Sequence, residues 1–269
     1  MSNGVVLDGY PDERRLSIRD RIFLGEGLFE TIRVTQARSR HAELHWQRLA
    51  RSAKCLGMEF DLSLQDWKML LQQHISQEKL QEGALKVILT GGIASRGLTE
   101  QGKHPQLLLQ TFQYARQKKP MRLISSDWLR DARNPMYGLK TINYLEAILA
   151  RRKAMAAQAD DVLFYNTVHH VTETSCANVF LIQQNKLFTP PLADGVLPGI
   201  TRQRVIAACI NQNISCTEKS LTQQDIGNAE AVFLTNTLQD IQSVCSIDEL
   251  VFSVEHPLLE KLENQLNKI

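Results

Sequence analysis

The sequence has no long apolar run and no surplus of charge of one sign. None of its hydrophobic stretches approaches the roughly 18 residues that a membrane-spanning helix needs, and Met1–Tyr10 lacks the pattern of a signal peptide. The 31 lysines and arginines nearly balance the 29 aspartates and glutamates, so the net charge is only +2. This balance gives no argument for binding to nucleic acid or to an anionic membrane. We therefore expect a soluble protein without a nucleic-acid or membrane partner.

Thiol and metal chemistry are also poorly represented. The five cysteines form no Cys-x-x-Cys pair, and their odd number argues against a disulfide framework, so a reducing cytoplasm is the simplest location. We interpret Cys176 as a small buried packing residue rather than a nucleophile. His41 and His45 are spaced to share a helix face, but Glu43 is misplaced for a zinc-protease motif and no third ligand is evident. We expect no metal site, and we expect His45 to help fix the segment that carries Arg48.

Residue periodicity predicts an α/β or mixed α+β chain and leaves its topology open. The hydrophobic fraction of 43% can fill a core, and 269 residues suit one large or two moderate domains. The expected helices are His45–Leu56, Leu64–Gln77, Tyr144–Ala157, Arg202–Asn211 and Pro257–Leu266. The expected strands are Ala84–Thr90, Leu107–Phe112, Arg122–Ser125, Val162–Tyr165, Val179–Gln183 and Ala231–Thr235. The charged segment 116–121 predicts a linker between a small N-terminal α/β domain, residues 1–115, and a larger domain, residues 122–269.

Lys140 stands at a predicted junction between a turn and a helix. It follows the turn-like segment 134–138 and precedes a run in which apolar residues recur at helical spacing: Leu145, Ile148, Leu149 and Met155. A lysine that acts as nucleophile and proton shuttle near neutral pH needs a pKa shift of about three units, or roughly 4 kcal/mol. A partly buried position near a helix N-terminus would favour such a shift. A solvent-exposed lysine is the ordinary alternative.

Two further segments carry groups that could bind a ligand. The segment 195–202 (GVLPGITR) predicts an anion-binding turn, with first-turn N–H groups and the Thr201 hydroxyl as donors, although a plain helix start with Thr201 as N-cap is the alternative. Glu173 lies between two strand-like runs, where an exposed hairpin acid would be ordinary. A buried carboxylate facing a pyridine nitrogen would keep it protonated through a bond worth about 1.5–3 kcal/mol. With Lys140 for an imine, the set describes pyridoxal 5'-phosphate (PLP).

Several segments occur in order along the chain: IRDRIFLGEGLFETIRV (18–34), HWQRL (45–49), LKTIN (139–143), VTETSCANVF (171–180), LPGITR (197–202) and FLTNT (233–237). This ordered set, which runs nearly end to end, resembles the fold-type IV, or class IV aminotransferase-like, PLP enzymes. That family includes branched-chain aminotransferases, D-amino-acid aminotransferases and aminodeoxychorismate lyases. The resemblance implies a two-domain fold, a larger C-terminal cofactor-binding domain, a cofactor at the domain junction, and a homodimer.

The resemblance also implies a role for each matching residue. Lys140 would bind PLP covalently and later move the proton, and Glu173 would pair with the pyridine nitrogen. The other cofactor contacts would be Arg48, Ile200, Thr201 and Thr237, which hold the phosphate, and Tyr144, which reaches the ring hydroxyl.

Details of two segments favour the lyases within this family. The compact Lys140-Thr-Ile-Asn segment lacks the longer glycine-containing stretch of branched-chain aminotransferases. The loop GGIASRGL carries Arg96 without the histidine of the Arg-x-His pair that grips the substrate carboxylate in D-amino-acid enzymes. Two departures from the lyase pattern are Leu98, where tyrosine is frequent, and Glu26, where aspartate is commoner.

The resemblance therefore implies the conversion of 4-amino-4-deoxychorismate into 4-aminobenzoate and pyruvate, a step of folate biosynthesis. This small substrate is a dicarboxylate, so localised cations are expected to bind it, with Arg96 and Arg33 as candidates. A D-amino-acid or branched-chain aminotransferase of the same fold is the alternative, and a non-catalytic cofactor-binding protein is a third possibility.

Overall fold

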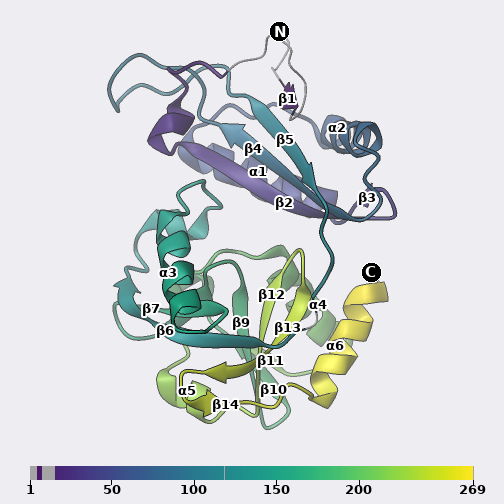
Figure 1. Cartoon of the computed structure of the whole chain (residues 1–269), viewed down its shortest axis with the longest axis vertical. Coiled ribbons are helices and arrows are strands. Elements are labelled where there is room, and N and C mark those ends of the chain that lie inside the picture. The colour runs from purple at the N-terminus through teal and green to yellow at the C-terminus, as the bar shows by residue number, and fades with distance from the viewer. Residues whose placement is uncertain (1–4, 8–15, 118, 269) are drawn as a thin grey trace. The chain divides into compact units, whose positions relative to one another are not determined.

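The chain folds into two units in a computed structural model that describes residues 5–7, 16–117 and 119–268 (Figure 1). The first unit comprises Met1–Arg116 and Leu139–Asn143, and the second comprises Gln117–Gly138 and Tyr144–Ile269. The sequence prediction placed Leu139–Asn143 with the C-terminal domain, whereas these residues pack with the first unit. Most of Met1–Tyr10, and Lys118 of the expected linker, lie outside the described residues.

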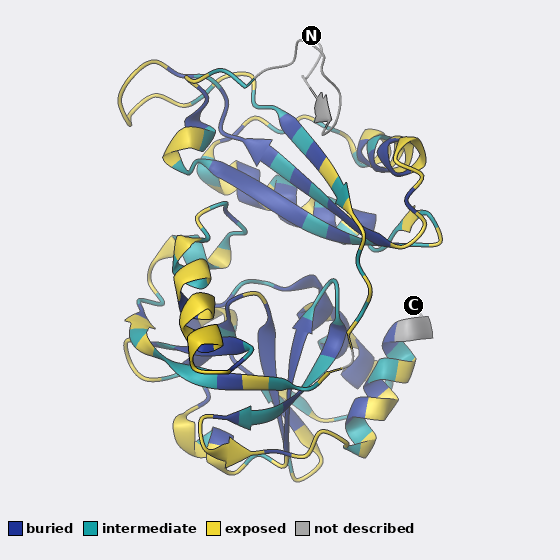
Figure 2. Ribbon diagram, in the orientation of Figure 1, coloured by how far each residue is buried: buried dark blue, intermediate teal, exposed yellow. Residues whose placement is uncertain are grey.

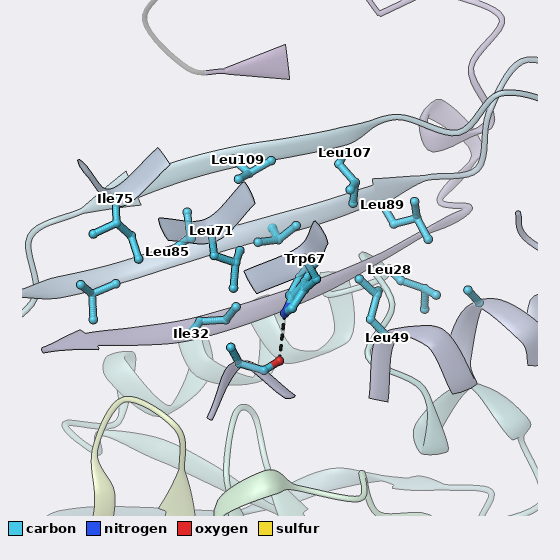
Figure 3. Close-up of a cluster of buried hydrophobic side chains, with 14 of the residues drawn as sticks. Leu28, Ile32, Leu49, Trp67, Leu71, Ile75, Leu85, Leu89, Leu107 and Leu109 are labelled. Atoms are coloured by element: carbon cyan, nitrogen blue, oxygen red, sulfur yellow. Dashed lines mark hydrogen bonds between the residues drawn. The ribbon is translucent and has the colours of Figure 1, made fainter. Parts of the chain in front are cut away.

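The first unit is a sheet covered on one face by two helices. Its five-stranded sheet has the order β1-β5-β4-β2-β3, antiparallel apart from the parallel pair β1 and β5. The elements are β1 (Val5–Leu7), η1 (Arg21–Leu24), β2 (Gly27–Thr35), β3 (Arg38–Ser39), α1 (Ala42–Leu56), α2 (Leu64–Gln77), β4 (Gly83–Thr90) and β5 (Leu107–Phe112). Apolar side chains from α1, α2 and three strands form one continuous core (Figure 3).

Local signals set the ends of both helices. Ser63 caps α2 by accepting from the Asp66 N–H at 3.1 Å, and Gly57 ends α1 in the left-handed conformation with φ of 68°. In β2 the residues Leu28, Ile32 and Val34 alternate toward the core, as the two-residue period of a strand requires. The same period places Glu30 on the core face of this strand.

Trp67 anchors α2 in the core. Its side chain is fully buried, and its indole N–H donates to the Ala42 carbonyl oxygen at 2.9 Å (Figure 3). We expect Trp67→Phe to lower the free energy of unfolding by about 1–2 kcal/mol, because it removes a buried hydrogen bond and some packing volume. Urea unfolding would measure the loss. Trp46→Phe is the matched control, because Trp46 donates to Leu62 from a half-buried position. An equal cost in both variants would contradict the role of Trp67.

The second unit is built on a sheet that closes on itself. Its nine-stranded sheet runs β11-β10-β9-β12-β13-β6-β7-β8, β14 pairs with β13, and a further β8–β9 pairing joins the strands from β9 to β8 into a ring. The strands are β6 (Met121–Arg130), β7 (Asp161–Asn166), β8 (Val171–Thr174), β9 (Asn178–Gln183), β10 (Lys186–Thr189), β11 (Cys216–Glu218), β12 (Ala231–Asn236), β13 (Asp240–Ile247) and β14 (Leu250–Val251). Closure positions β8, which carries Glu173, against β9.

Helices flank this ring and enclose separate apolar clusters. They are η2 (Pro135–Gly138), α3 (Leu145–Ala156), η3 (Leu192–Asp194), α4 (Ile200–Asn211), α5 (Gln223–Gly227) and α6 (Pro257–Lys268). The expected helix at Tyr144–Ala157 is present as α3, but it buries Ala150 and Ala154. Most of this helix is exposed (Figure 2). The apolar residues that predicted it lie exposed instead. Within the described residues, no helix is both long enough and apolar enough to cross a membrane.

Candidate active site

The Lys140 segment is attached to the start of β2 by its backbone. The Phe29 N–H donates to the Lys140 carbonyl oxygen at 2.9 Å, and the Ile142 N–H donates to the Gly27 carbonyl oxygen at 3.0 Å. The Asn143 side-chain amide donates to the Gly25 carbonyl oxygen at 2.9 Å. Gly25 has φ of 85°, and a Cβ there would overlap the Asn143 side chain, so glycine is required twice over. The glycine turn and the lysine segment are therefore fitted to each other.

The Lys140 side chain lies over an aromatic ring. Its Nζ atom is 4.0 Å from the centroid of the Phe29 ring, and the residue is half-buried. Residues at alternate positions of β2 share a face, so Arg33 is on the same side of the strand as Phe29. Lys140 does not lie in the first turn of a helix, because α3 begins at Leu145 in the other unit. The Phe29 ring therefore lies beside the ammonium group, which is not at the start of α3.

A buried ionic cluster occupies the core side of β2. Glu30 accepts from Arg48 through both carboxylate oxygens, at 2.8 Å from Nε and 2.6 Å from Nη2, and its Oε2 lies 2.5 Å from His45 Nδ1. Burial would raise the pKa of Glu30, but the adjacent Arg48 and His45 lower it to about 2. Burial also lowers the pKa of His45 more than Glu30 raises it. A neutral His45 then donates its Nδ1–H to the Glu30 carboxylate.

Arg48 is thus positioned by a carboxylate that the sequence reasoning did not identify. His45 and Arg48 both come from α1 and share Glu30, which matches the expectation that His45 helps to fix the Arg48 segment. Alternation along β2 was the signal that could have found Glu30, because it places an acid among Leu28 and Ile32 on a core face.

Glu173 is held in the second unit by donors on both oxygens. It lies within β8 rather than in a hairpin turn, and it is half-buried. Its Oε1 is 3.4 Å from Nη1 of Arg130. Its Oε2 accepts from the Asn178 amide at 3.2 Å and from the Leu197 N–H at 3.1 Å. Arg130 was also missed from the sequence.

The predicted anion-binding turn forms the N-terminus of α4. Gly199 is the N-cap and no side chain caps it, so Thr201 lies inside the first turn, and the alternative of Thr201 as N-cap is wrong. The Asn178 amide donates to the Leu197 carbonyl oxygen at 2.9 Å, which links this turn to Glu173. Ile200 and Thr201 are both buried at the start of the helix.

Gly199 has a steric requirement that can be tested. A Cβ at this position would overlap the Asn178 side chain. We expect Gly199→Ala to destabilise the second unit by about 1–3 kcal/mol through overpacking. Thermal unfolding would measure the loss. Gly227→Ala is the matched control, because nothing lies within 4 Å of a Cβ there. Equal stability of the two variants would contradict the close packing of Gly199 on Asn178.

The remaining candidates are dispersed over both units. Tyr144 is the N-cap residue of α3, and Thr237 follows β12 in a half-buried turn. Arg96 is exposed on a loop. Cys176 is exposed, which corrects the expectation of a buried packing residue. Within the described residues, no cluster of three or more histidine, cysteine or acidic side chains is arranged to hold a metal ion.

The departure at Glu26 has a structural explanation. Glu26 forms an ion pair with Arg21, and Arg21 in turn donates from Nη1 to the Gly97 carbonyl oxygen at 3.2 Å. The glutamate therefore helps to hold the Arg96 loop. Leu98 in the same loop is 78% exposed, and no structural reason for leucine there is evident.

The fold and these segments define a known class of protein. Residues 27–247 match the amino-transferase class IV family, and the chain belongs to this family. The architecture is the mixed α/β fold of fold-type IV enzymes. Solved structures with this fold hold PLP or its pyridoxamine form.

Three relatives narrow the comparison. A Legionella pneumophila protein that carries the provisional name 4-amino-4-deoxychorismate lyase is 52% identical, and its crystal structure matches with a TM-score of 0.95 over 98% of both chains. The aminodeoxychorismate lyase of Vibrio harveyi is 25% identical over 97% of this chain and 98% of its own length. The D-alanine aminotransferase of Bacillus licheniformis is 29% identical over 88% of this chain and 84% of its own length. Lyases and aminotransferases are thus both among the relatives.

The residues present fit the chemistry of PLP. The second unit offers a carboxylate fixed by three donors, which suits a protonated pyridine nitrogen. It also offers a helix N-terminus without a side-chain cap, which suits a phosphate. In the same unit, Thr235 of β12 carries a buried hydroxyl without a hydrogen-bond partner among the described residues. The first unit offers a half-buried lysine for covalent attachment.

Proposed function

We propose that this protein is a PLP-dependent lyase that converts 4-amino-4-deoxychorismate into 4-aminobenzoate and pyruvate in folate biosynthesis. The observation that carries the proposal is the 52% identity, over 98% of both chains, to a protein provisionally named as that lyase. The compact lysine segment supports it, because only two residues separate Lys140, which bonds to Phe29 of β2, from Asn143, which bonds to Gly25.

In this proposal the family roles apply to the matching residues. Lys140 attaches PLP, Glu173 keeps the pyridine nitrogen protonated, and Tyr144 binds the ring hydroxyl. The phosphate is bound by the amides of Ile200 and Thr201, the Thr201 hydroxyl, Arg48 and Thr237. When bound, PLP supplies an electron sink for the pair left behind by proton removal.

The protein residues then have two tasks in the reaction. Lys140 removes the proton from the substrate carbon that bears nitrogen, and in protonated form it returns a proton as the enolpyruvyl ether leaves as pyruvate. The six-membered ring of the substrate becomes aromatic when its carbon–oxygen bond to the enolpyruvyl group breaks. The step is therefore effectively irreversible and needs no amino acceptor. Arg33 and Arg96 bind the two carboxylates of the substrate. Arg33 is supported by its position on the same side of β2 as Phe29.

We also propose a cytoplasmic homodimer. The exposed apolar side chains of α3 support a self-association surface, because Ile148 and Leu149 follow Leu145 by one turn and all three are more than 40% exposed. Figure 2 shows that this helix is mostly exposed. The five free cysteines support a reducing compartment. Light scattering should give twice the chain mass of 30.5 kDa.

Borohydride reduction followed by peptide mapping tests the shared premise of PLP attachment. We expect a pyridoxyl group on Lys140. Its absence would exclude both the lyase and every PLP-dependent alternative.

Substrate assays separate the lyase from its runner-up. An aminotransferase is the second candidate, because D-alanine aminotransferase is 29% identical over 88% of the chain. The purified protein would receive 4-amino-4-deoxychorismate in one assay, and D-alanine or L-leucine with 2-oxoglutarate in the others. Formation of 4-aminobenzoate and pyruvate is expected. Rapid glutamate formation without 4-aminobenzoate would instead identify an aminotransferase.

A further inference from the structure

Arg130 is a buried cation shared by two carboxylates of the second unit. Its side chain is 5% exposed, and it contacts Glu173 at 3.4 Å through Nη1 and Glu146 at 3.0 Å through both Nε and Nη2. Glu146 lies on α3 and Glu173 on β8, so the arginine, at the end of β6, joins two elements. Neither the sequence motifs nor the family roles described above assign it a function.

Aromatic rings restrict where the Arg130 guanidinium can lie. Its central carbon is 3.5 Å from the centroid of the Phe164 ring and 4.9 Å from that of Tyr137. The hydrogen bonds to Glu146 are supported from the other side, because Glu146 also accepts from the Trp128 indole N–H at 3.1 Å. The cation is thus fixed beside Glu173 by packing as well as by charge.

Two neutral donors also bind Glu173. Asn178 of β9 and the Leu197 N–H before α4 both bind Oε2. Tyr137 of η2 interacts with Glu146, and burial and this carboxylate raise the Tyr137 pKa. Arg151 and Asp161 contact the exposed Cys176 instead. Arg130 is therefore a cationic side chain that forms an ion pair with Glu173.

We infer that Arg130 is a positioning residue that keeps Glu173 in its carboxylate form and aimed at the cofactor's pyridine nitrogen. Glu146 partly offsets the positive charge of Arg130. The role in PLP binding rests on the proposed function, whereas the electrostatic coupling of Arg130 to Glu173 does not. A positive charge within about 4–6 Å lowers the pKa of a carboxyl by about 1–3 units. Glu146 competes for the same cation, so it weakens the effect on Glu173.

The test compares two variants that should act in opposite directions. The apoprotein is prepared with glutamate labelled by ¹³C at the side-chain carboxyl, and the Glu173 resonance is assigned by its loss in Glu173→Gln. We expect Arg130→Met to raise the Glu173 pKa by about one unit or more. We expect Glu146→Gln to lower it, because Arg130 then serves Glu173 alone. Arg130→Lys, which keeps the charge, should restore much of the shift.

Arg133→Met is the matched control. This arginine is three positions away, has a side chain that is 89% exposed and pairs with Asp131, so its loss should leave the Glu173 pKa unchanged. Shifts of the same sign in Arg130→Met and Glu146→Gln, or no shift in Arg130→Met, would overturn the inference. If circular dichroism shows that Arg130→Met is misfolded, the Glu173 pKa measured in Arg130→Lys decides whether Arg130 has this role.

A second readout connects this coupling to the cofactor. The affinity of the apoprotein for PLP should weaken below the pH at which Glu173 gains a proton. In Arg130→Met this loss of affinity should begin at a higher pH. If wild-type protein binds no PLP, the proposed function fails while the carboxyl titration still decides the role of Arg130.

Discussion

Replacement of Lys140 by alanine is expected to abolish turnover of 4-amino-4-deoxychorismate. The variant loses the amine that attaches the cofactor and also the group that transfers the proton. General acid–base catalysis alone contributes about 10²–10⁴-fold, so the combined loss should be on the order of 10⁴-fold or more. Formation of 4-aminobenzoate, followed by fluorescence or chromatography at saturating PLP, measures the effect. Thermal unfolding of the variant should stay close to wild type, because the side chain is only half-buried.

Lys86 supplies a control on the same aromatic ring. Its Nζ atom lies 4.9 Å from the Phe29 centroid, compared with 4.0 Å for Lys140. Lys86→Ala therefore removes a comparable cation–π contact without removing the proposed nucleophile, and activity should remain within a few-fold of wild type. Residual activity of Lys140→Ala above about 1% of wild type would exclude Lys140 as the essential group, since general acid–base catalysis alone is worth about 10²-fold or more.

Replacement of Glu30 by glutamine is expected to lower the free energy of unfolding of the first unit by about 3–5 kcal/mol. The reason is that Arg48 stays buried, with its side chain 5% exposed, after its carboxylate partner is lost. Urea unfolding followed by the fluorescence of Trp46 and Trp67 would report the transition. PLP affinity should also fall, because Arg48 is no longer positioned.

Glu43→Gln provides the surface control for this effect. Glu43 lies on the same helix as Arg48 and pairs with Lys68 at 3.6 Å, but its side chain is 52% exposed. An exposed pair of this kind contributes about 0–1 kcal/mol. A cost for Glu30→Gln no larger than that for Glu43→Gln would contradict the importance of the buried cluster.

The stability contributed by Glu30 should depend on pH in a defined window. Its pKa is lowered from the ordinary value of 4.5 to about 2 in the folded protein. The contribution is therefore complete above about pH 4.5 and is lost as the pH falls toward 2, because the unfolded chain takes up the proton first. The difference in unfolding free energy between wild type and Glu30→Gln should become smaller as the pH falls through this window. A difference that stays constant would show that Glu30 is not charged in the fold.

The sequence predicted the family, and this prediction was confirmed. The roles of Lys140 and Glu173 stay predictions, drawn from short motifs that occur in order along the chain. Glu30 and Arg130 carry no motif of their own. Their importance comes from partners far away in sequence, on α1 and on α3 and β8, so it depends on packing that local periodicity does not encode.

The predicted helices and strands follow short apolar runs or apolar residues at helical spacing. All five expected helices and all six expected strands are present, with ends that moved by a few residues in most of them. The expected strand Arg122–Ser125 extends to Arg130 in the structure. Its pairing with β7 is irregular after Ser125, which interrupts the alternation of side chains that would have marked the rest of the strand. The helix α3 was correctly predicted from a face that turned out to be exposed. Periodicity identified the element but could not say which surface the neighbouring strands would cover.

The return of Leu139–Asn143 to the first unit has a consequence for how the molecule can be divided. A gene fragment that ends at Arg116 would encode every strand of the five-stranded sheet, yet it would lack the peptide that bonds to Phe29 and Gly27 at the start of β2. A fragment that begins at Gln117 would carry Lys140 without the ring over which it lies. Neither half of the gene therefore encodes a complete setting for the lysine, and dissection by truncation would separate Lys140 from its structural support.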